Sequence, residues 1–298
     1  MKRYLLTTCF LCIVSLIAGP VYAASLQDIE QAIQQRGARW VAGENSVWNR
    51  SDIEKQRLVG TILEGTNRDA KGKGQFVALP TSFDWRSQNI VTSIKDQGNC
   101  GGCWAFASVA ALESLLLINH SVTAEPDLSE QFLVSYDIRN RGCNGGTLSA
   151  AAAFLEKQGT PSEACKPYQA TSRKMPFPCS DWKDQAAGIG AFESVEQTVD
   201  ALKAAVYKGP VPTGFYVFED FYAYTGGVYS HVSGKKVGGH AVLVVGWDDV
   251  QQCFIVKNSW GPDWGEHGYF RIAYSEMTTD VAFGTDTVSY VEPWMLEY

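Results

Sequence analysis

The sequence predicts an α+β fold with two lobes, one built mainly from helices and one mainly from strands. Apolar residues recur at helical spacing over residues 103–118, whereas the last third of the chain contains short β-branched and aromatic runs bounded by Gly, Asp and Asn. Helices and strands that are separated along a chain are typical of this class. With 298 residues, 45% of them hydrophobic and 19% charged, the chain can form a two-lobed domain with a packed core.

The first 23 residues are typical of a signal peptide. Met1-Lys2-Arg3 is basic, residues 5–18 form an almost unbroken apolar run, and Val21-Tyr22-Ala23 offers the small residues that a signal peptidase reads. The run is too short to favour a membrane span of about 20 residues. We therefore expect cleavage near Ala23, entry into the secretory pathway and no stable membrane anchor. A retained anchor is the alternative interpretation.

Residues 24–80 differ in character from the rest. Residues 25–36 have an amphipathic helical pattern, and residues 60–74 are rich in glycine, charge and polar groups, which is typical of an exposed, cleavable linker. A segment of this length does not favour a stable globular unit of its own. We expect a pro-segment that lies on the main domain and ends in an activation linker, with the main domain spanning residues 81–298.

The main domain should begin with helices and end with strands. The helices are predicted at residues 103–118, 148–155 and 195–207, the second ended by Gly159-Thr160-Pro161 and the third by Gly209-Pro210. The strands are predicted at residues 240–245, 253–256 and 268–272.

Charge and cysteine content limit the partners and the chemistry. The formal charge is −7 and no basic stripe is present, which argues against a nucleic-acid partner. Cys9 and Cys12 leave with the signal peptide, and six cysteines remain. An oxidising compartment favours pairing. The count allows either three disulfides or two disulfides and two free thiols.

Cys103 is the candidate nucleophile. It follows Gly101 and Gly102, which permit a tight turn, and it opens the predicted helix at residues 103–118. The free N–H groups and the dipole of a helix N-terminus stabilise a thiolate. A neighbouring imidazolium would add more.

His240 is the candidate base. It lies in Val237-Gly238-Gly239-His240-Ala241, where a loop enters a predicted strand. Asn258 follows the next strand of the same hairpin, where its side-chain oxygen could accept the ring N–H and fix the tautomer of the imidazole.

Residues 79–298 resemble the papain family of cysteine proteases. The resemblance is carried by Gln97-Gly-Asn-Cys-Gly-Gly-Cys103-Trp104, by His240 and by Lys257-Asn258-Ser-Trp260-Gly. Gly102 stands where the family has Ser or Ala. The family fold has a helical N-terminal lobe and an antiparallel, β-barrel-like C-terminal lobe. The resemblance implies protein and peptide substrates and no metal or other cofactor.

The resemblance also assigns roles. Cys103 attacks the peptide carbonyl, and His240 carries the proton to the leaving amine. Gln97 and the backbone N–H of Cys103 form the oxyanion hole, Asn258 orients His240, and Trp260 shields the Asn–His contact from water. An acyl-enzyme forms and is hydrolysed.

Several segments resemble cathepsin B within this family: residues 40–45, 79–86 and 165–168. Cathepsin B carries a long occluding loop with paired histidines, which enables it to remove C-terminal dipeptides. The stretch between Cys165 and Cys179 is short and has no histidine. This departure predicts an open cleft and an endopeptidase.

The family pattern implies two disulfides, Cys100–Cys143 and Cys165–Cys179, with Cys103 free. Cys253, which precedes Phe254-Ile255-Val256, is then expected to be a buried, inert thiol.

The resemblance further places residues in the substrate cleft. Gly145 and Gly146 would pair with the substrate backbone. Gly239 and Ala241 would line the S2 pocket. Asp286 would lie at the base of that pocket and favour Arg there, although an Asp in such a segment is also compatible with a solvated surface charge.

A monomeric zymogen follows from these assignments. The pro-segment would block the cleft as an inhibitor, and acid would loosen it by protonating carboxylates. The compartment would be lysosome- or vacuole-like, or extracellular.

Three other interpretations use the same residues. Cys100, Cys103, Cys143 and His240 could bind zinc. The Cys100-x-x-Cys103 pair could be a thioredoxin-like redox motif, although no βαβ pattern surrounds it. The chain could also be a catalytically inactive papain-like binding protein, although all four catalytic positions hold competent groups.

Overall fold

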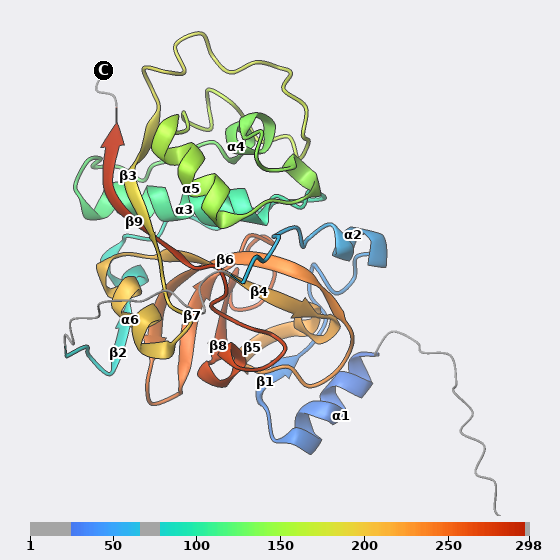
Figure 1. Cartoon of the computed structure of the whole chain (residues 1–298). Coiled ribbons are helices and arrows are strands. Elements are labelled where there is room, and N and C mark those ends of the chain that lie inside the picture. Colours follow the sequence, from blue (N-terminus) through green and yellow to red (C-terminus); the bar gives the residue numbers. More distant parts are fainter. Residues whose placement is uncertain (1–24, 66–77, 296–298) are drawn as a thin grey trace, which may run out of the picture.

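The computed structural model describes residues 25–65 and 78–295, which form two lobes (Figure 1). The predicted signal peptide at residues 1–23 and most of the predicted activation linker lie outside these ranges. Within them, no helix has both the length and the apolar character that crossing a membrane requires.

The first lobe is built around one buried helix, α3 (Cys103–Ile118), whose first fourteen residues are all buried. It packs with α4 (Glu130–Tyr136) and α5 (Leu148–Lys157). Side chains of Ser129 and Thr147 cap α4 and α5 by accepting backbone N–H groups. A two-stranded antiparallel sheet, β3 (Ala187–Ser194) with β9 (Val288–Met295), closes this lobe.

The second lobe is a strongly curved seven-stranded sheet with the order β1-β5-β8-β7-β6-β2, in which β4 also pairs with β6. Its longest strand, β6, alternates little because it is buried along most of its length. The strands are β1 (Arg39–Ala42), β2 (Ser82–Asp84), β4 (Val211–Phe218), β5 (Tyr224–Tyr229), β6 (Lys236–Asp248), β7 (Cys253–Lys257) and β8 (Tyr269–Ala273). Helix α6 (Val199–Lys208) packs on β6.

Short 3-10 helices connect these elements. They are η2 (Trp85–Gln88), η3 (Gly142–Asn144), η4 (Glu219–Ala223) and η5 (Tyr274–Met277).

The N-terminal segment, residues 25–65, lies on the second lobe and contributes to its sheet. It contains α1 (Leu26–Arg36), β1 and α2 (Asp52–Gln56). Strand β1 pairs antiparallel with β5, and Trp40 is buried against the rings of Tyr224 and Tyr229. Residues 25–65 therefore pack against the strand-rich lobe through a shared sheet and an aromatic contact.

Most predicted elements are confirmed, but their order along the chain is less simple than expected. The helices at 103–118 and 148–155 are α3 and α5, and the three strands form the centres of β6, β7 and β8. The third helix begins at Val199, where Thr198 caps it. Helices do not simply precede strands, because β1 and β2 precede α3, and α6 joins the strand-rich lobe.

Two disulfides join the pairs that the resemblance implied, Cys100–Cys143 and Cys165–Cys179. Cys103 and Cys253 are free and buried, and burial raises the pKa of Cys253 to about 11. Since Cys100 is bonded to Cys143, neither is available as a zinc ligand, and Cys100 is not the redox partner of Cys103.

Candidate active site

Cys103 lies at the junction of the lobes, at the first residue of α3. The preceding glycines allow the backbone to approach closely. A Cβ on Gly101 would lie 2.7 Å from the carbonyl oxygen of Cys143, closer than real side chains come. The thiol is completely buried and meets the hydroxyl of Thr61, with Oγ1 3.1 Å from Sγ.

His240 faces this junction from β6, where it pairs with Phe215 of β4. Its Nε2 lies 2.8 Å from Oδ1 of Asn258, the residue that follows β7. The indole of Trp260 covers the imidazole with ring centroids 4.7 Å apart. All three side chains are buried, so the His–Asn contact is shielded from solvent. Nδ1 has no hydrogen-bond partner among the described residues.

Gln97 is held by contacts that the sequence did not reveal. Its side-chain Oε1 accepts a hydrogen bond from the Ser259 hydroxyl at 2.8 Å, and its backbone oxygen accepts one from the Tyr168 hydroxyl at 2.8 Å. Its Nε2 donates to the carbonyl oxygens of Cys100 at 2.8 Å and Leu58 at 3.1 Å. The amide is therefore fixed, and one of its acceptors comes from the N-terminal segment.

The N-terminal segment crosses the junction directly over Cys103. The N–H groups of Gly60 and Thr61 donate to the carbonyl oxygen of Gly239, at 2.9 and 3.0 Å. On the other side, Gly146 donates to Gly60 at 2.9 Å and accepts from Ile62 at 2.8 Å. Residues 58–65 thus bridge both lobes by main-chain hydrogen bonds, and the bridge between Thr61 and Gly146 is parallel.

Glycine is required where this segment approaches. A Cβ on Gly145 would lie 2.4 Å from the carbonyl oxygen of Gly60, and one on Gly239 would lie 2.1 Å from that of Thr61. Gly145 also has a φ of 112°, which disfavours other residues. Gly145, Gly146 and Gly239 therefore face one extended backbone.

Asp286 contacts the N-terminal segment, whereas Ala241 lies in a pocket between the lobes. The Asp286 carboxylate accepts the backbone N–H of Glu64 at 2.5 Å and that of Gly65 at 3.3 Å. It is only 6% exposed, so it is not a solvated surface charge. Ala241 is buried and lines a pocket between the lobes. The side chain of Leu63 packs against Gly239 and Gly214.

Burial keeps the candidate catalytic pair uncharged in this state. It raises the pKa of the Cys103 thiol, an effect that the Thr61 hydroxyl partly opposes. Burial also lowers the pKa of His240 to about 4, against the opposing effect of the hydrogen bond to Asn258. A thiol and a neutral imidazole are therefore favoured while residues 58–65 cover them.

The start of the predicted linker needs correction. Residues 60–74 were expected to be exposed, yet Thr61 is 5% exposed and Gly60 contacts the backbone of Gly101. The residues that cover the site, Leu58, Gly60 and Thr61, were missed by sequence reasoning. The available signal was the apolar run at residues 58–63, which is unusual for an exposed linker.

Comparisons with known proteins agree with this geometry. A family model described as "Papain family cysteine protease" matches residues 79–289. "Cathepsin B-like CP3" of Giardia intestinalis is 41% identical over 276 residues, covering 86% of this chain and 92% of the relative. "Cathepsin B-like cysteine proteinase 6" of Caenorhabditis elegans is 34% identical, covering 84% of this chain and 77% of the relative.

Solved precursor structures share the fold. The "proCathepsin B S9" structure from Trypanosoma congolense has a TM-score of 0.80 and 26% identity, covering 91% of this chain and 99% of that chain. A digestive procathepsin L2 from Tenebrio molitor has a TM-score of 0.75 and 28% identity, covering 89% and 88%. The similarity therefore extends over the N-terminal segment as well as the two lobes.

Proposed function

Since the chain belongs to the papain family of cysteine proteases, we propose that it is an endopeptidase made as a latent precursor, with Cys103 as nucleophile and His240 as base. The observation that carries this proposal is the arrangement at the junction of the lobes. There a helix-initial thiol, an Asn258-bound imidazole and a fixed Gln97 amide all lie beneath one extended segment of chain.

In the proposed reaction, His240 takes the thiol proton and the Cys103 thiolate attacks the carbonyl carbon of the scissile bond. The oxyanion is stabilised by Nε2 of Gln97 and the backbone N–H of Cys103. His240 then gives its proton to the leaving amine, which departs and leaves a thioester. Water, deprotonated by His240, hydrolyses that thioester, releases the carboxylate product and restores the thiol.

Asn258 and Trp260 support His240 in this scheme. The oxygen of Asn258 accepts the Nε2 proton, which leaves Nδ1 as the nitrogen that exchanges a proton with sulfur. Trp260 covers the same edge and excludes water, which would compete for the hydrogen bond.

The test is a comparison of processed protein with its Cys103→Ala variant on a peptide library. We expect the variant to lose hydrolysis, and iodoacetamide to inactivate the wild type by alkylating one thiol. Cys253 supplies the matched control, since Cys253→Ala should keep both activity and inactivation. Hydrolysis that persists in Cys103→Ala would overturn the assignment and favour an inactive binding protein with a contaminating activity.

The loop between Cys165 and Cys179 supports an open cleft. Its backbone oxygens at Thr171, Arg173 and Lys174 accept hydrogen bonds from side chains of the helical lobe, namely Gln131, Ser135 and Tyr136. The loop is therefore tied to α4, and it offers no histidine to hold a substrate carboxylate. This supports endopeptidase activity rather than removal of C-terminal dipeptides.

Two peptides of one sequence, with a free and an amidated C-terminus, test this specificity. An endopeptidase should cleave both at the same internal bond with kcat/KM within about twofold. A strong preference for the free carboxylate, with release of C-terminal dipeptides, would contradict it.

Substrate is proposed to use the surfaces that residues 58–65 cover. Gly145 and Gly146 would pair with its backbone, and Gly239 would border the pocket that receives the P2 side chain. Leu63 lies against Gly239 and Gly214, which supports an aliphatic P2 residue. The Asp286 carboxylate binds Glu64 and Gly65, which directly follow Leu63, and this supports acceptance of Arg at P2 once those residues have left.

Residues 24–80 are proposed to be the inhibitory pro-segment, released by cleavage within the linker. The protein would act as a monomer in a lysosome- or vacuole-like compartment or outside the cell. Acid would weaken the pro-segment through carboxylates such as Glu54. Hydrogen bonds from Ser51 lower its pKa, so they stabilise α2 above that pKa and are lost as the pH falls through it.

A further inference from the structure

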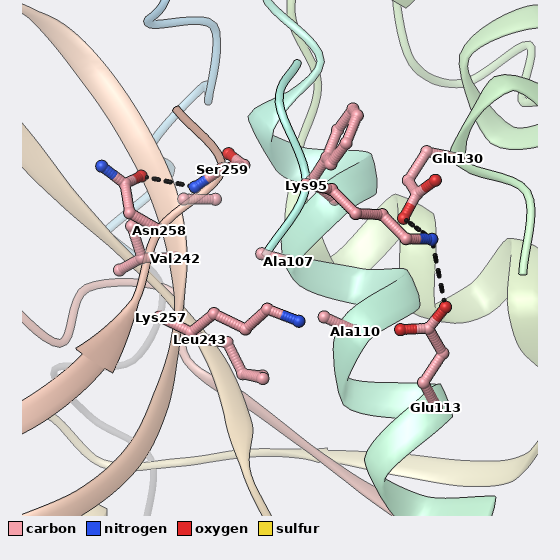
Figure 2. A pocket seen from close by; sticks show the side chains of 12 residues that line it. Lys95, Ala107, Ala110, Glu113, Glu130, Val242, Leu243, Lys257, Asn258 and Ser259 are labelled. Carbon is pink, nitrogen blue, oxygen red and sulfur yellow. Dashed lines mark hydrogen bonds and ion pairs between the residues drawn. The ribbon is translucent and has the colours of Figure 1, made fainter. Parts of the chain in front are cut away.

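A pocket between the lobes, directly behind the candidate catalytic pair, contains four ionisable side chains (Figure 2). Lys95, Glu113 and Glu130 line it from the helical side, and Lys257 lines it from the strand side. Asn258, the partner of His240, also lines it. Charged groups are rarely buried unless they are paired, so this set calls for an explanation.

The helical side of the pocket is an ion network centred on Lys95. Its Nζ lies 2.9 Å from Glu130 Oε1, 3.2 Å from Glu113 Oε1 and 2.8 Å from Asp127 Oδ1. Glu113 lies on α3, the helix that begins at Cys103, and its side chain is completely buried. The network therefore anchors the helix that carries the candidate nucleophile.

Lys257 connects this network to the other lobe. Its Nζ donates to the backbone oxygen of Thr92 at 2.8 Å and to Thr92 Oγ1 at 3.0 Å. That hydroxyl in turn donates to Oε2 of Glu113 at 2.6 Å. Figure 2 shows Lys257 extending from the strand side toward α3, where Ala110 and Glu113 lie. A continuous hydrogen-bonded chain thus runs from the end of β7 to α3.

This chain reaches the two elements that carry the candidate catalytic pair. Lys257 directly precedes Asn258, which holds His240, and Glu113 lies on the helix whose first residue is Cys103. The link is short on the His240 side, whereas on the Cys103 side it runs along about three turns of the buried helix α3, roughly 15 Å. A change in the Lys257 contact would shift Asn258 and the imidazole relative to the sulfur, and catalysis is sensitive to such misplacement.

We propose that Lys257 is a positioning residue for the reaction: through Thr92 and Glu113 it fixes Asn258, and with it His240, relative to Cys103. This inference rests on the proposed function, because it gives those three residues their proposed roles. Lys257 itself does not touch substrate or the reacting atoms.

The charge on Lys257 should make this positioning sensitive to alkali. Burial lowers its pKa to about 8, while Glu113, Glu130 and Glu125 favour the charged form and Lys95 opposes it. Above that pH the ammonium loses its proton, so its hydrogen bonds to Thr92 and its electrostatic attraction to Glu113 weaken. The charged form, and the positioning that it provides, is present below pH 8 and lost above it.

The experiment compares Lys257→Met and Lys257→Arg with processed wild-type enzyme, using kinetics on a peptide substrate from pH 5 to pH 10. In the wild type we expect kcat to fall above about pH 8, where Lys257 loses its proton; this fall is called the alkaline decline. Lys257→Met should lower kcat about tenfold, leave KM within about twofold, and lack the alkaline decline. Lys257→Arg should keep activity to higher pH, because guanidinium stays charged. Rates are expressed per folded protein, measured from the near-UV circular dichroism of each variant against wild type, which corrects for unfolded protein.

Lys203→Met is the matched control. Lys203, on α6, is also largely buried and forms an ion pair with Asp249, 2.7 Å apart, but within residues 25–65 and 78–295 neither side chain hydrogen-bonds to Asn258 or Thr92. The Lys203→Met enzyme should keep the wild-type kcat and the alkaline decline. Glu130→Gln should retain a decline, moved to lower pH because it removes a carboxylate that favours the charged form of Lys257; loss of the decline would instead assign it to Glu130, whose pKa burial raises to about 8.

Two results would overturn the inference. One is a Lys257→Met enzyme with wild-type kcat and decline, and the other is an equal loss in Lys203→Met. If Lys257→Met does not fold, an Arg variant whose decline stays near pH 8 overturns it equally. The proposed function is tested separately, because its failure requires hydrolysis by Cys103→Ala, whereas failure of this inference leaves that variant inactive.

Discussion

At the scale of single residues, the site depends on side chains that are held by buried hydrogen bonds. Gln97 is fixed by Ser259 and Tyr168, and His240 is fixed by Asn258 under the Trp260 ring. Removing one partner of a buried hydrogen bond costs more than the bond itself contributes, because the remaining group has no water to replace it. These supporting residues should therefore matter nearly as much as the reacting ones.

Replacing Asn258 tests this expectation. Asn258→Ala leaves Nε2 of His240 without an acceptor, at a cost of about 1–3 kcal/mol. We expect kcat for peptide hydrolysis to fall about tenfold to a hundredfold. Asn258→Asp keeps an acceptor oxygen and should retain most activity. Equal kcat in Asn258→Ala and wild type would contradict the orienting role.

At the scale of elements, the N-terminal segment has two parts with different roles. Its first part docks on the strand-rich lobe, where β1 extends the sheet at β5 and Trp40 fills an aromatic site. Its last part, residues 58–65, crosses the candidate site by main-chain hydrogen bonds. Docking therefore holds the covering part at high local concentration, so a modest affinity over the site is sufficient.

A single methyl group introduced at Gly60 should displace residues 58–65 from the candidate site. A Cβ there would lie 2.2 Å from the carbonyl oxygen of Gly101, and backbone cannot yield as a flexible side chain would. Such overpacking typically costs about 1–3 kcal/mol. We therefore expect Gly60→Ala precursor to hydrolyse a peptide roughly tenfold faster than wild-type precursor before any cleavage occurs.

Initial rates, with the precursor band followed on a gel, measure this effect. Ile53→Ala is the control on the same segment, because Ile53 is 68% exposed and should not change latency. An unchanged rate in Gly60→Ala would show that residues 58–65 do not limit access.

At the scale of the whole molecule, covering the site couples to pH through His240. Its pKa falls from the ordinary 6.5 to about 4 because it is buried beneath the segment and the lobes. A state in which the ring is exposed to water binds the proton that the covered state excludes. The contribution of His240 to the stability of the covered state is therefore complete above pH 6.5. It is lost as the pH falls from 6.5 toward 4.

This linkage predicts acid release. Between pH 6.5 and 4, the equilibrium for covering should weaken by up to about tenfold per pH unit, since one pKa unit corresponds to about 1.4 kcal/mol. Limited proteolysis of the N-terminal segment in Cys103→Ala precursor measures it. A second precursor, with His240→Gln added, should show a shallower pH dependence, leaving only the contribution of carboxylates. Equal slopes in the two proteins would exclude His240 as a sensor.

Much of the main domain could be predicted from local pattern. Helix α3 begins at Cys103 and ends at Ile118 as expected, because two glycines precede apolar residues that recur at helical spacing. The hairpin that carries His240 and Asn258 was expected for the same kind of reason, since both strands are short apolar runs bounded by turn residues. The other strands, β1 to β5 and β9, and helix α4 were not predicted. Strand β4 is buried beside β6, but Pro212 and Gly214 interrupt its strand pattern.

The sequence by itself determined the fold class, the candidate nucleophile and the residues around it, because helix and strand periodicity and the Cys, His and Asn motifs are local properties of the chain. Only the tertiary structure decided which part of the N-terminal segment covers the site, that Asp286 meets Glu64, and that Lys257 reaches α3 through Thr92. These contacts join residues far apart in the chain, and they form only after both lobes have packed.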